Sequence, residues 1–254
     1  MNVKFRDKIR AALWHFLITA VVGSLIATLV FLVWFPPPFA TMMDGIKLFA
    51  IVLGCDLILG PLMSLVIFDR GKSRRSLIID YAVVGVLQLA ALLYGVTVVA
   101  QYRPVYIAFT VDRFDVVSAG NIEKEDLIEA TDPQYKRLPL LGPKLVVAVK
   151  PDNSEERTQS IFLALAGKDI SARPNFYRPY ESKHAEIVNA IHPLKELFER
   201  NSDREKLVMT AVQSHHLSPD NVGWLAVKHP RGFWIALMDK QTAMPIDYLP
   251  IEPY

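Results

Sequence analysis

Cysteine is almost absent from this chain. Its 254 residues include one cysteine, Cys55, so no disulfide bond can join two parts of the chain. The stability of the fold must therefore come from packing alone. A region of about 150 residues can bury enough surface to fold without a disulfide.

The chain also lacks the short motifs that mark common active sites. The patterns G-x-S-x-G, Walker A and G-x-G-x-x-G do not occur. Five histidines lie beyond residue 180 with no cysteine partner and no H-x3-H spacing, and we expect them to be solvated rather than metal-bound. They are His184, His192, His215, His216 and His229. We therefore expect no enzyme activity, no metal and no cofactor.

Charged side chains are missing from long stretches of the N-terminal part. Residues 11–35 and 81–102 contain no Asp, Glu, Lys or Arg, and residues 48–68 contain one such residue, Asp56. Each run holds about 20 residues or more, enough to cross a hydrocarbon core of about 30 Å. We predict a membrane domain of residues 1–102 with three transmembrane helices. Their approximate bounds are 12–35, 46–68 and 77–101.

Lysine and arginine are missing from the loop between the first two spans, about residues 36–45, but they flank the other ends. These basic residues are Lys4, Arg6, Lys8, Arg10, Arg70, Lys72, Arg74 and Arg75. Positively charged loops stay in the cytoplasm, so we expect a cytoplasmic N-terminus and an exported chain after Tyr102. In a Gram-negative bacterium this means an inner-membrane protein with a periplasmic domain. The first run is too long for a cleaved signal peptide.

Residues 103–254 have the pattern of a small α+β domain. Strand-forming sequence occupies 105–117 and 145–150, and helical spacing marks 157–167, 182–200 and 204–215. Pro193 should kink the middle helix or divide it in two. The end of the chain alternates like an antiparallel β-meander, with a turn at Pro230-Arg231-Gly232. We predict a three-helix transmembrane bundle followed by this periplasmic α+β domain.

Asp56 is an ionisable residue in the middle of an apolar helix. Such a residue costs at least about 2.5–3.5 kcal/mol on insertion scales, so we expect it to face the bundle interior. Counting along each helix places Ser24, Asp56 and Gln88 at a similar depth, and we predict that they form a polar cluster. Pro61 should kink the helix, and Gly60 should admit a neighbouring helix. These residues could hold the bundle together or form a docking face for another membrane helix.

The junction after the third span is a second candidate site. Tyr102 passes into strand-forming sequence without a linker, so we expect the exported domain to lie close to the membrane. We assign a structural rather than catalytic role to a membrane-proximal motif at this junction. It comprises Arg103, Pro104, Asp112, Arg113 and Phe114.

Several separated motifs occur in order along the chain. They are D-x-x-x-G-P-L-M-S (56–64), D-Y-A-V-V-G-V-L-Q-L-A-A-L-x-Y-G (80–95), R-P-V-Y-x-x-F-x-V-D-R-F (103–114), W-x-A-L-M-D-K-Q-T-A (234–243) and Y-L-P-I-E-P-Y (248–254). Together they resemble the TfpX/TfpZ family of type IV pilin accessory proteins. The resemblance implies an inner-membrane protein that promotes assembly or dynamics of type IV pili by interacting with its cognate major pilin, without catalysis.

The resemblance also implies the partners. The major type IV pilin is the expected contact, with pilus assembly-platform proteins and membrane lipid as others; no nucleic acid and no small-molecule substrate is expected. Two alternatives are a membrane sensor or binding protein with an extracytoplasmic ligand-binding domain, and a pilin-modifying enzyme. A sensor would need a cytoplasmic output domain, and a nucleotide-sugar enzyme would need a D-x-D motif. The sequence contains neither.

Overall fold

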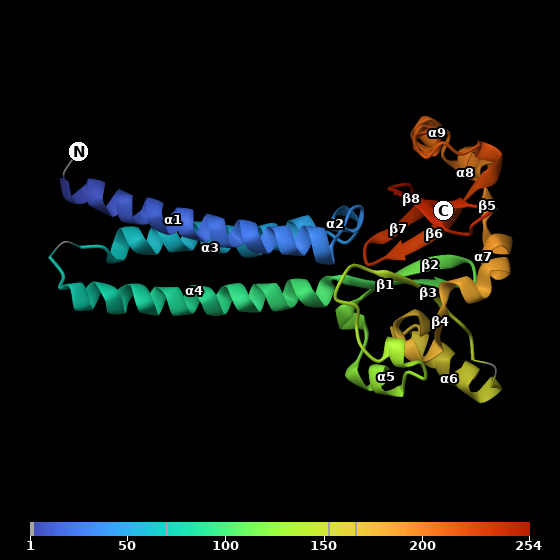
Figure 1. Cartoon of the computed structure of the whole chain (residues 1–254), viewed down its shortest axis with the longest axis horizontal. Coiled ribbons are helices and arrows are strands. Elements are labelled where there is room, and N and C mark those ends of the chain that lie inside the picture. Colours follow the sequence, from blue (N-terminus) through green and yellow to red (C-terminus); the bar gives the residue numbers. More distant parts are fainter. Residues whose placement is uncertain (1–2, 70, 152, 166) are drawn as a thin grey trace. The chain divides into compact units, whose positions relative to one another are not determined.

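A computed structural model describes residues 3–69, 71–151, 153–165 and 167–254. The chain divides into two compact units, Met1–Tyr102 and Arg103–Tyr254. Long helices form the first unit, and a β-sheet with short helices forms the second (Figure 1).

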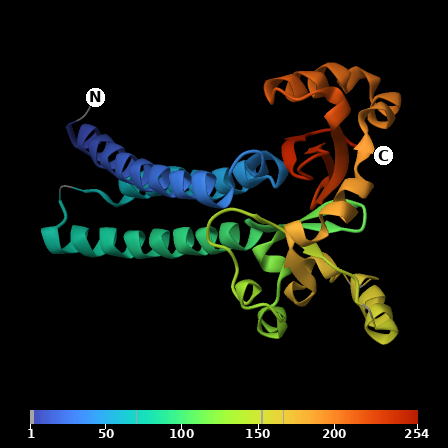
Figure 2. The same cartoon turned by 45° about the vertical axis from the view of Figure 1, so that its right-hand side comes forward.

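The long helices of the first unit lie side by side (Figures 1 and 2). They are α1 (Val3–Leu29), which continues into the π-helix η1 (Val30–Trp34), α3 (Gly45–Ile67) and α4 (Arg74–Tyr102). The short helix α2 (Phe39–Met42) lies between the first two. All three long helices are apolar and long enough to cross a membrane. The predicted three-helix arrangement is confirmed.

Two of these helices begin earlier than predicted. Helix α1 starts at Val3 rather than near residue 12, because the basic residues before the apolar run are good helix formers. Helix α4 starts at Arg74, where the Ser73 hydroxyl accepts a hydrogen bond of 3.2 Å from the backbone N–H of Ser76. A serine in this position caps a helix N-terminus, so the basic loop residues continue into α4.

Helix α3 is the central element of the bundle, because it packs against both α1 and α4. Its buried residues are Gly45, Phe49, Asp56, Gly60 and Ser64. They recur mostly at spacings of four and so form one narrow face. The outward faces of the three helices carry exposed leucine, isoleucine and valine side chains, as expected for surfaces that contact lipid.

A mixed sheet forms the second unit. Eight strands are found in the described residues, in the order β4-β3-β1-β2-β6-β7-β8, with β5 paired to β6. They are β1 (Pro104–Thr110), β2 (Arg113–Ser118), β3 (Lys144–Ala148), β4 (Tyr177–Pro179), β5 (His192–Pro193), β6 (Val222–His229), β7 (Gly232–Asp239) and β8 (Pro245–Leu249). The pairs β1–β3 and β2–β6 are parallel and the others antiparallel. The predicted α+β class, with antiparallel strands at its end, is confirmed.

One strand prediction is wrong. Residues 105–117 are not a single strand but the hairpin β1–β2, in which Thr110 pairs with Arg113. The turn consists of Val111 and Asp112. A two-residue hairpin turn is usually marked by glycine or asparagine. Valine in the turn therefore made the sequence look like a continuous strand.

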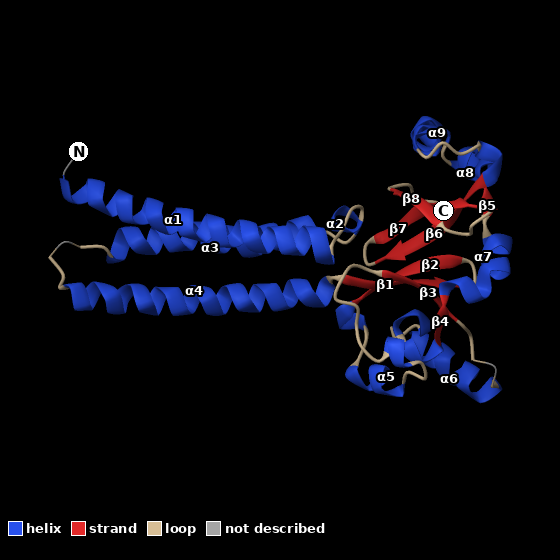
Figure 3. Cartoon of the chain, in the orientation of Figure 1, coloured by secondary structure: helices blue, strands red, loops and turns tan. Residues whose placement is uncertain are grey.

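Short α-helices flank the sheet in the described residues (Figure 3). They are α5 (Lys124–Glu129), α6 (Ser154–Leu165), α7 (His184–Ala190), α8 (Leu194–Arg200) and α9 (Glu205–Ser214). Pro193 separates α7 from α8, so the segment predicted around it forms two helices in succession. One hydrophobic cluster contains Tyr106, Tyr135 and Tyr177, and Leu127 of α5 packs against it. The other packs α8 and α9 onto β6, β7 and β8.

Replacing Gly223 with alanine should destabilise the second unit. A Cβ atom at this position in β6 would lie 2.5 Å from the backbone carbonyl oxygen of His192 in β5, which no side-chain rotation can relieve. Overpacking of this kind costs about 1–3 kcal/mol. The chain has four tryptophans, so Trp14 and Trp34 of the first unit are replaced by phenylalanine to leave Trp224 and Trp234 as the fluorescent reporters. The thermal unfolding midpoint measured in this background should shift down by several degrees. An unchanged midpoint would show that the β5–β6 contact is not tight.

Candidate functional site

A cluster of hydrogen-bonded polar side chains joins the three long helices. His15 of α1 lies between Ser64 of α3 and Gln88 of α4, with His15 Nδ1 2.6 Å from Ser64 Oγ and His15 Nε2 2.8 Å from Gln88 Oε1. An amide oxygen can only accept, so His15 Nε2–H donates to Gln88. In the neutral ring, Nδ1 then accepts from the Ser64 hydroxyl. One imidazole thus connects α1 to both other helices.

Gly60 allows this cluster to form. A Cβ atom at Gly60 would lie 2.5 Å from Gln88 Nε2 and 2.8 Å from His15 Nε2. A larger residue would therefore occupy the space in which these two side chains meet. Close approach through glycine is a common feature of helix contacts in membranes.

Asp56 lies one helical turn before Gly60 on the same face of α3 and is 7% exposed. Together with His15 and Gln88 it lines a cavity of about 230 Å³. The other lining residues are Ile18, Thr19, Val22, Gly23, Leu53, Gly85, Leu89 and Leu92. Within the described residues, the buried Gln88 Nε2 has no hydrogen-bond partner, and the carboxyl group of Asp56 lines the same cavity. The cavity therefore contains an acceptor and a donor that other groups can still bind.

The cavity opens between α1 and α4, and α3 forms its floor. Ile18 and Leu89 line it yet are 61% and 56% exposed, so its rim lies at the surface of the bundle. A Cβ atom at Gly85 would have no neighbour within 4 Å, so this part of α4 faces open space. We call this feature the bundle slot. Its lining is apolar apart from His15, Thr19, Asp56 and Gln88.

The predicted cluster of Ser24, Asp56 and Gln88 is corrected by the structure. Asp56 and Gln88 line one cavity, but Ser24 is exposed on the outer face of α1. Its neighbour Gly23 faces α3, and successive helical residues point about 100° apart, so Ser24 turns away. The number of residues from the helix end predicts how deep Ser24 lies along α1. It does not predict which side of the helix Ser24 is on.

His15 and Ser64 were missed in the sequence. His15 is the only histidine in the first apolar run. A polar ring in such a run indicates a side chain that faces the interior of the bundle. Ser64 lies eight residues after Asp56 and four after Gly60, which places it on the same helical face. Helix α3 is continuous through Pro61, and the kink proposed there stays a prediction.

The five residues assigned to a membrane-proximal motif do not form one group. Arg103 and Pro104 lie at the start of β1, whereas Asp112 and Arg113 lie at the turn that follows its end. A strand of this length spans about 20 Å. Phe114 is fully buried and packs against Phe109 and Tyr180. Its role is in the core of the second unit.

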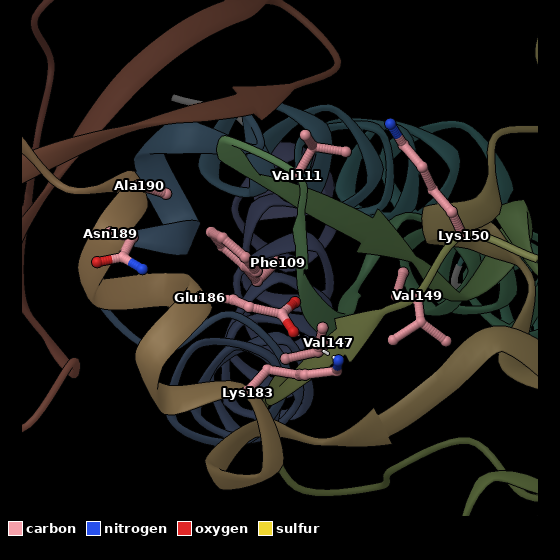
Figure 4. Close-up of a pocket in the computed structure, with 10 residues that line it drawn as sticks. Phe109, Val111, Val147, Val149, Lys150, Lys183, Glu186, Asn189 and Ala190 are labelled. Atoms are coloured by element: carbon pink, nitrogen blue, oxygen red, sulfur yellow. Dashed lines mark hydrogen bonds and ion pairs between the residues drawn. The ribbon is translucent and has the colours of Figure 1, made fainter.

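The second unit contains a hollow of about 520 Å³ between the ends of β1 and β3 and helix α7 (Figure 4). Phe109 and Val147 contribute apolar surface to its lining. Lys183 Nζ and Glu186 Oε1 lie 2.6 Å apart at its edge and form an ion pair. The hollow combines apolar and charged groups, as protein-binding surfaces often do.

A smaller cavity of about 230 Å³ in the same unit contains Asp115 and His229. Burial raises the pKa of Asp115, although Arg113, whose Nε lies 3.1 Å from Asp115 Oδ1, opposes that shift. Burial lowers the pKa of His229. Among the residues described, no group of three or more His, Cys, Asp or Glu side chains could hold a metal ion.

Comparison with known proteins relates most of the chain to fimbrial assembly proteins. The family described as "Fimbrial assembly protein FimB" matches residues 3–44. The serogroup I fimbrial assembly protein of Dichelobacter nodosus is 33% identical over 239 residues, covering 92% of this chain and 93% of that protein. The serogroup E1 protein of the same organism is 32% identical, with the same coverage. No solved structure matches the chain. The chain belongs to the fimbrial assembly protein family.

Proposed function

We propose that this protein is a non-catalytic accessory factor of the TfpX/TfpZ type, which promotes assembly or dynamics of type IV pili by binding its cognate major pilin. The apolar membrane helix of the pilin would occupy the bundle slot. The similarity to fimbrial assembly proteins supports a role in pilus assembly. The bundle slot supports binding of a membrane helix.

The position of Asp56 carries the proposal. A carboxylate at the floor of a slot that opens toward lipid is costly unless a polar or protein partner covers it. Gln88 Nε2 is a buried donor without a partner in the described residues, and it lines the same slot. An apolar helix with a polar group at the matching depth would satisfy both side chains and exclude lipid from them.

The second unit would contact the part of the pilin that extends beyond the membrane. The hollow of Figure 4 is the candidate surface, because apolar walls next to an ion pair suit a folded protein surface. Contacts of both units with one pilin would add avidity, since the second contact becomes intramolecular. Assembly-platform proteins could use the outer faces of the helices.

Co-purification tests this proposal directly. A tagged copy of the protein, extracted in mild detergent from cells that assemble pili, should retain the major pilin encoded in the same strain. Replacement of that pilin by an unrelated one should reduce recovery. Equal recovery of both pilins, or of neither, would contradict a pilin-specific accessory role.

Reporter fusions should establish the membrane topology that we propose, with a cytoplasmic N-terminus and a periplasmic second unit. Alkaline phosphatase is active only after export, so fusion after Tyr254 should give high activity. Fusion after Ser73, in the basic loop, should give little activity because positively charged loops stay inside. The reverse pattern would show that the chain is inserted the other way round.

A further inference from the structure

An exposed pair of leucines in the second unit is not explained by packing. Leu140 and Leu141 are 74% and 78% exposed in the loop between η3 (Pro133–Tyr135) and β3. Their neighbours Leu138 and Pro139 are at least partly buried, so the loop itself is fixed to the domain. Two adjacent, exposed leucines on an anchored loop indicate a surface that contacts something apolar.

The loop is fixed at the point where the chain leaves α4. The Arg103 guanidinium donates a hydrogen bond of 3.4 Å to the carbonyl oxygen of Pro139, and Arg103 directly follows Tyr102, the last residue of α4. Tyr106 donates through its hydroxyl to the Arg137 carbonyl oxygen, also at 3.4 Å. Both donors are at the beginning of β1.

The strand register also places the loop at the end of the sheet where β1 starts. Strands β1 and β3 are parallel, and Tyr106 pairs with Lys144. The loop before β3 therefore emerges at the edge of the sheet where β1 starts. One residue separates the end of α4 from the start of β1, and α4 is long and apolar enough to span a membrane. The loop of Leu140 and Leu141 therefore lies at the end of the sheet where the chain enters from such a helix.

The charged residues that flank the leucines in the sequence are all basic. Lys136, Arg137 and Lys144 are exposed, and none forms an ion pair with a residue that the structure describes. The sequence from 133 to 151 contains no Asp or Glu. Apolar side chains flanked by basic ones suit a bilayer surface with anionic headgroups, where leucine enters the interface and lysine or arginine binds phosphate.

We propose that residues 136–144 form a lipid anchor, in which Leu140 and Leu141 insert into the membrane interface and the three basic side chains bind anionic phospholipid headgroups. The anchor would hold the second unit at the membrane surface. It rests on the proposed insertion of α4, but not on which side of the membrane the second unit occupies.

Fluorescence quenching in lipid nanodiscs tests the anchor with the full chain. In a Cys55→Ala background, a single cysteine at Leu141 carries an environment-sensitive dye. Nanodiscs with anionic phosphatidylglycerol contain nitroxide-labelled lipid or are exposed to aqueous iodide. The matched control is Val111→Cys, another exposed apolar position, in the turn beyond the opposite end of β1. A third label at Leu93→Cys reports insertion of α4.

The anchor predicts that the Leu141 label is quenched by nitroxide lipid and is several-fold less sensitive to iodide than the Val111 label. Changing Lys136, Arg137 and Lys144 to glutamate should restore iodide quenching. Similar quenching of Leu141 and Val111 would overturn the proposal. If Leu93 is quenched by lipid and Leu141 is not, the anchor fails while α4 insertion stands. If neither is quenched by lipid, the membrane placement itself fails.

Discussion

Replacement of Asp56 by leucine should strongly reduce the number of surface pili, whereas replacement by asparagine should retain most of them. Asp56 lies in the floor of the bundle slot beside His15 and Gln88, so asparagine keeps a polar group of the same size there. Leucine removes it. Loss of a polar contact worth about 1–2 kcal/mol weakens binding of a partner helix roughly tenfold. Pili sheared from cells and quantified by immunoblot measure the effect.

Cys55→Leu is the matched control for this change. Cys55 precedes Asp56 but is exposed on the outer face of α3, so leucine at this position adds apolar surface without entering the slot. Pilus number should be unchanged. The Asp56→Leu protein should still accumulate in the membrane, because leucine favours insertion. Wild-type piliation with leucine at Asp56 would show that the carboxylate has no role in binding.

Replacement of Gly60 by valine should disrupt the bundle itself. The first carbon of the new side chain would already lie 2.5 Å from Gln88 Nε2 and 2.8 Å from His15 Nε2. Overpacking costs about 1–3 kcal/mol, and losing the His15 hydrogen bonds adds about 0.6–2 kcal/mol. We expect a lower thermal midpoint in detergent and a lower protein level in cells, together with loss of pili.

Gly54→Val provides the comparison on the same helix. A Cβ atom at Gly54 would have no neighbour within 4 Å, so valine fits there without displacing another side chain. Both substitutions introduce the same residue into α3, and only the contact with α1 and α4 differs. Equal stability of the two variants would argue against tight packing of the polar cluster around Gly60.

Much of this architecture follows from local sequence pattern. The three apolar runs predict the three long helices, because an uncharged run of about 20 residues has the length of a membrane-spanning helix. The β6–β7 hairpin was also predictable, since Pro230-Arg231-Gly232 interrupts two alternating strands at a glycine with a φ of 137°. In both cases, the signal lies within about 30 residues of sequence.

The remaining features depend on contacts between distant residues. The parallel pairs β1–β3 and β2–β6 are formed by strands with long intervening segments, and no local pattern specifies such partners. In the bundle, the position of Ser24 in the sequence gives its depth along α1. It does not show that the Ser24 side chain points away from α3. The hydrogen-bond partner of Gln88 is His15, which lies 73 residues earlier in the sequence. No local pattern pairs two residues so far apart.

Photocrosslinking in living cells tests the central claim most directly. Probes at Ile18 and Leu89 would line the bundle slot, whereas probes at Leu13 and Val83 would lie on outward faces of the same helices with similar exposure. Binding of the pilin helix in the slot predicts crosslinks to the major pilin from Ile18 and Leu89 that are absent or much weaker from Leu13 and Val83. Crosslinks of equal yield from all four positions, or pilin crosslinks only from the outward faces, would contradict it.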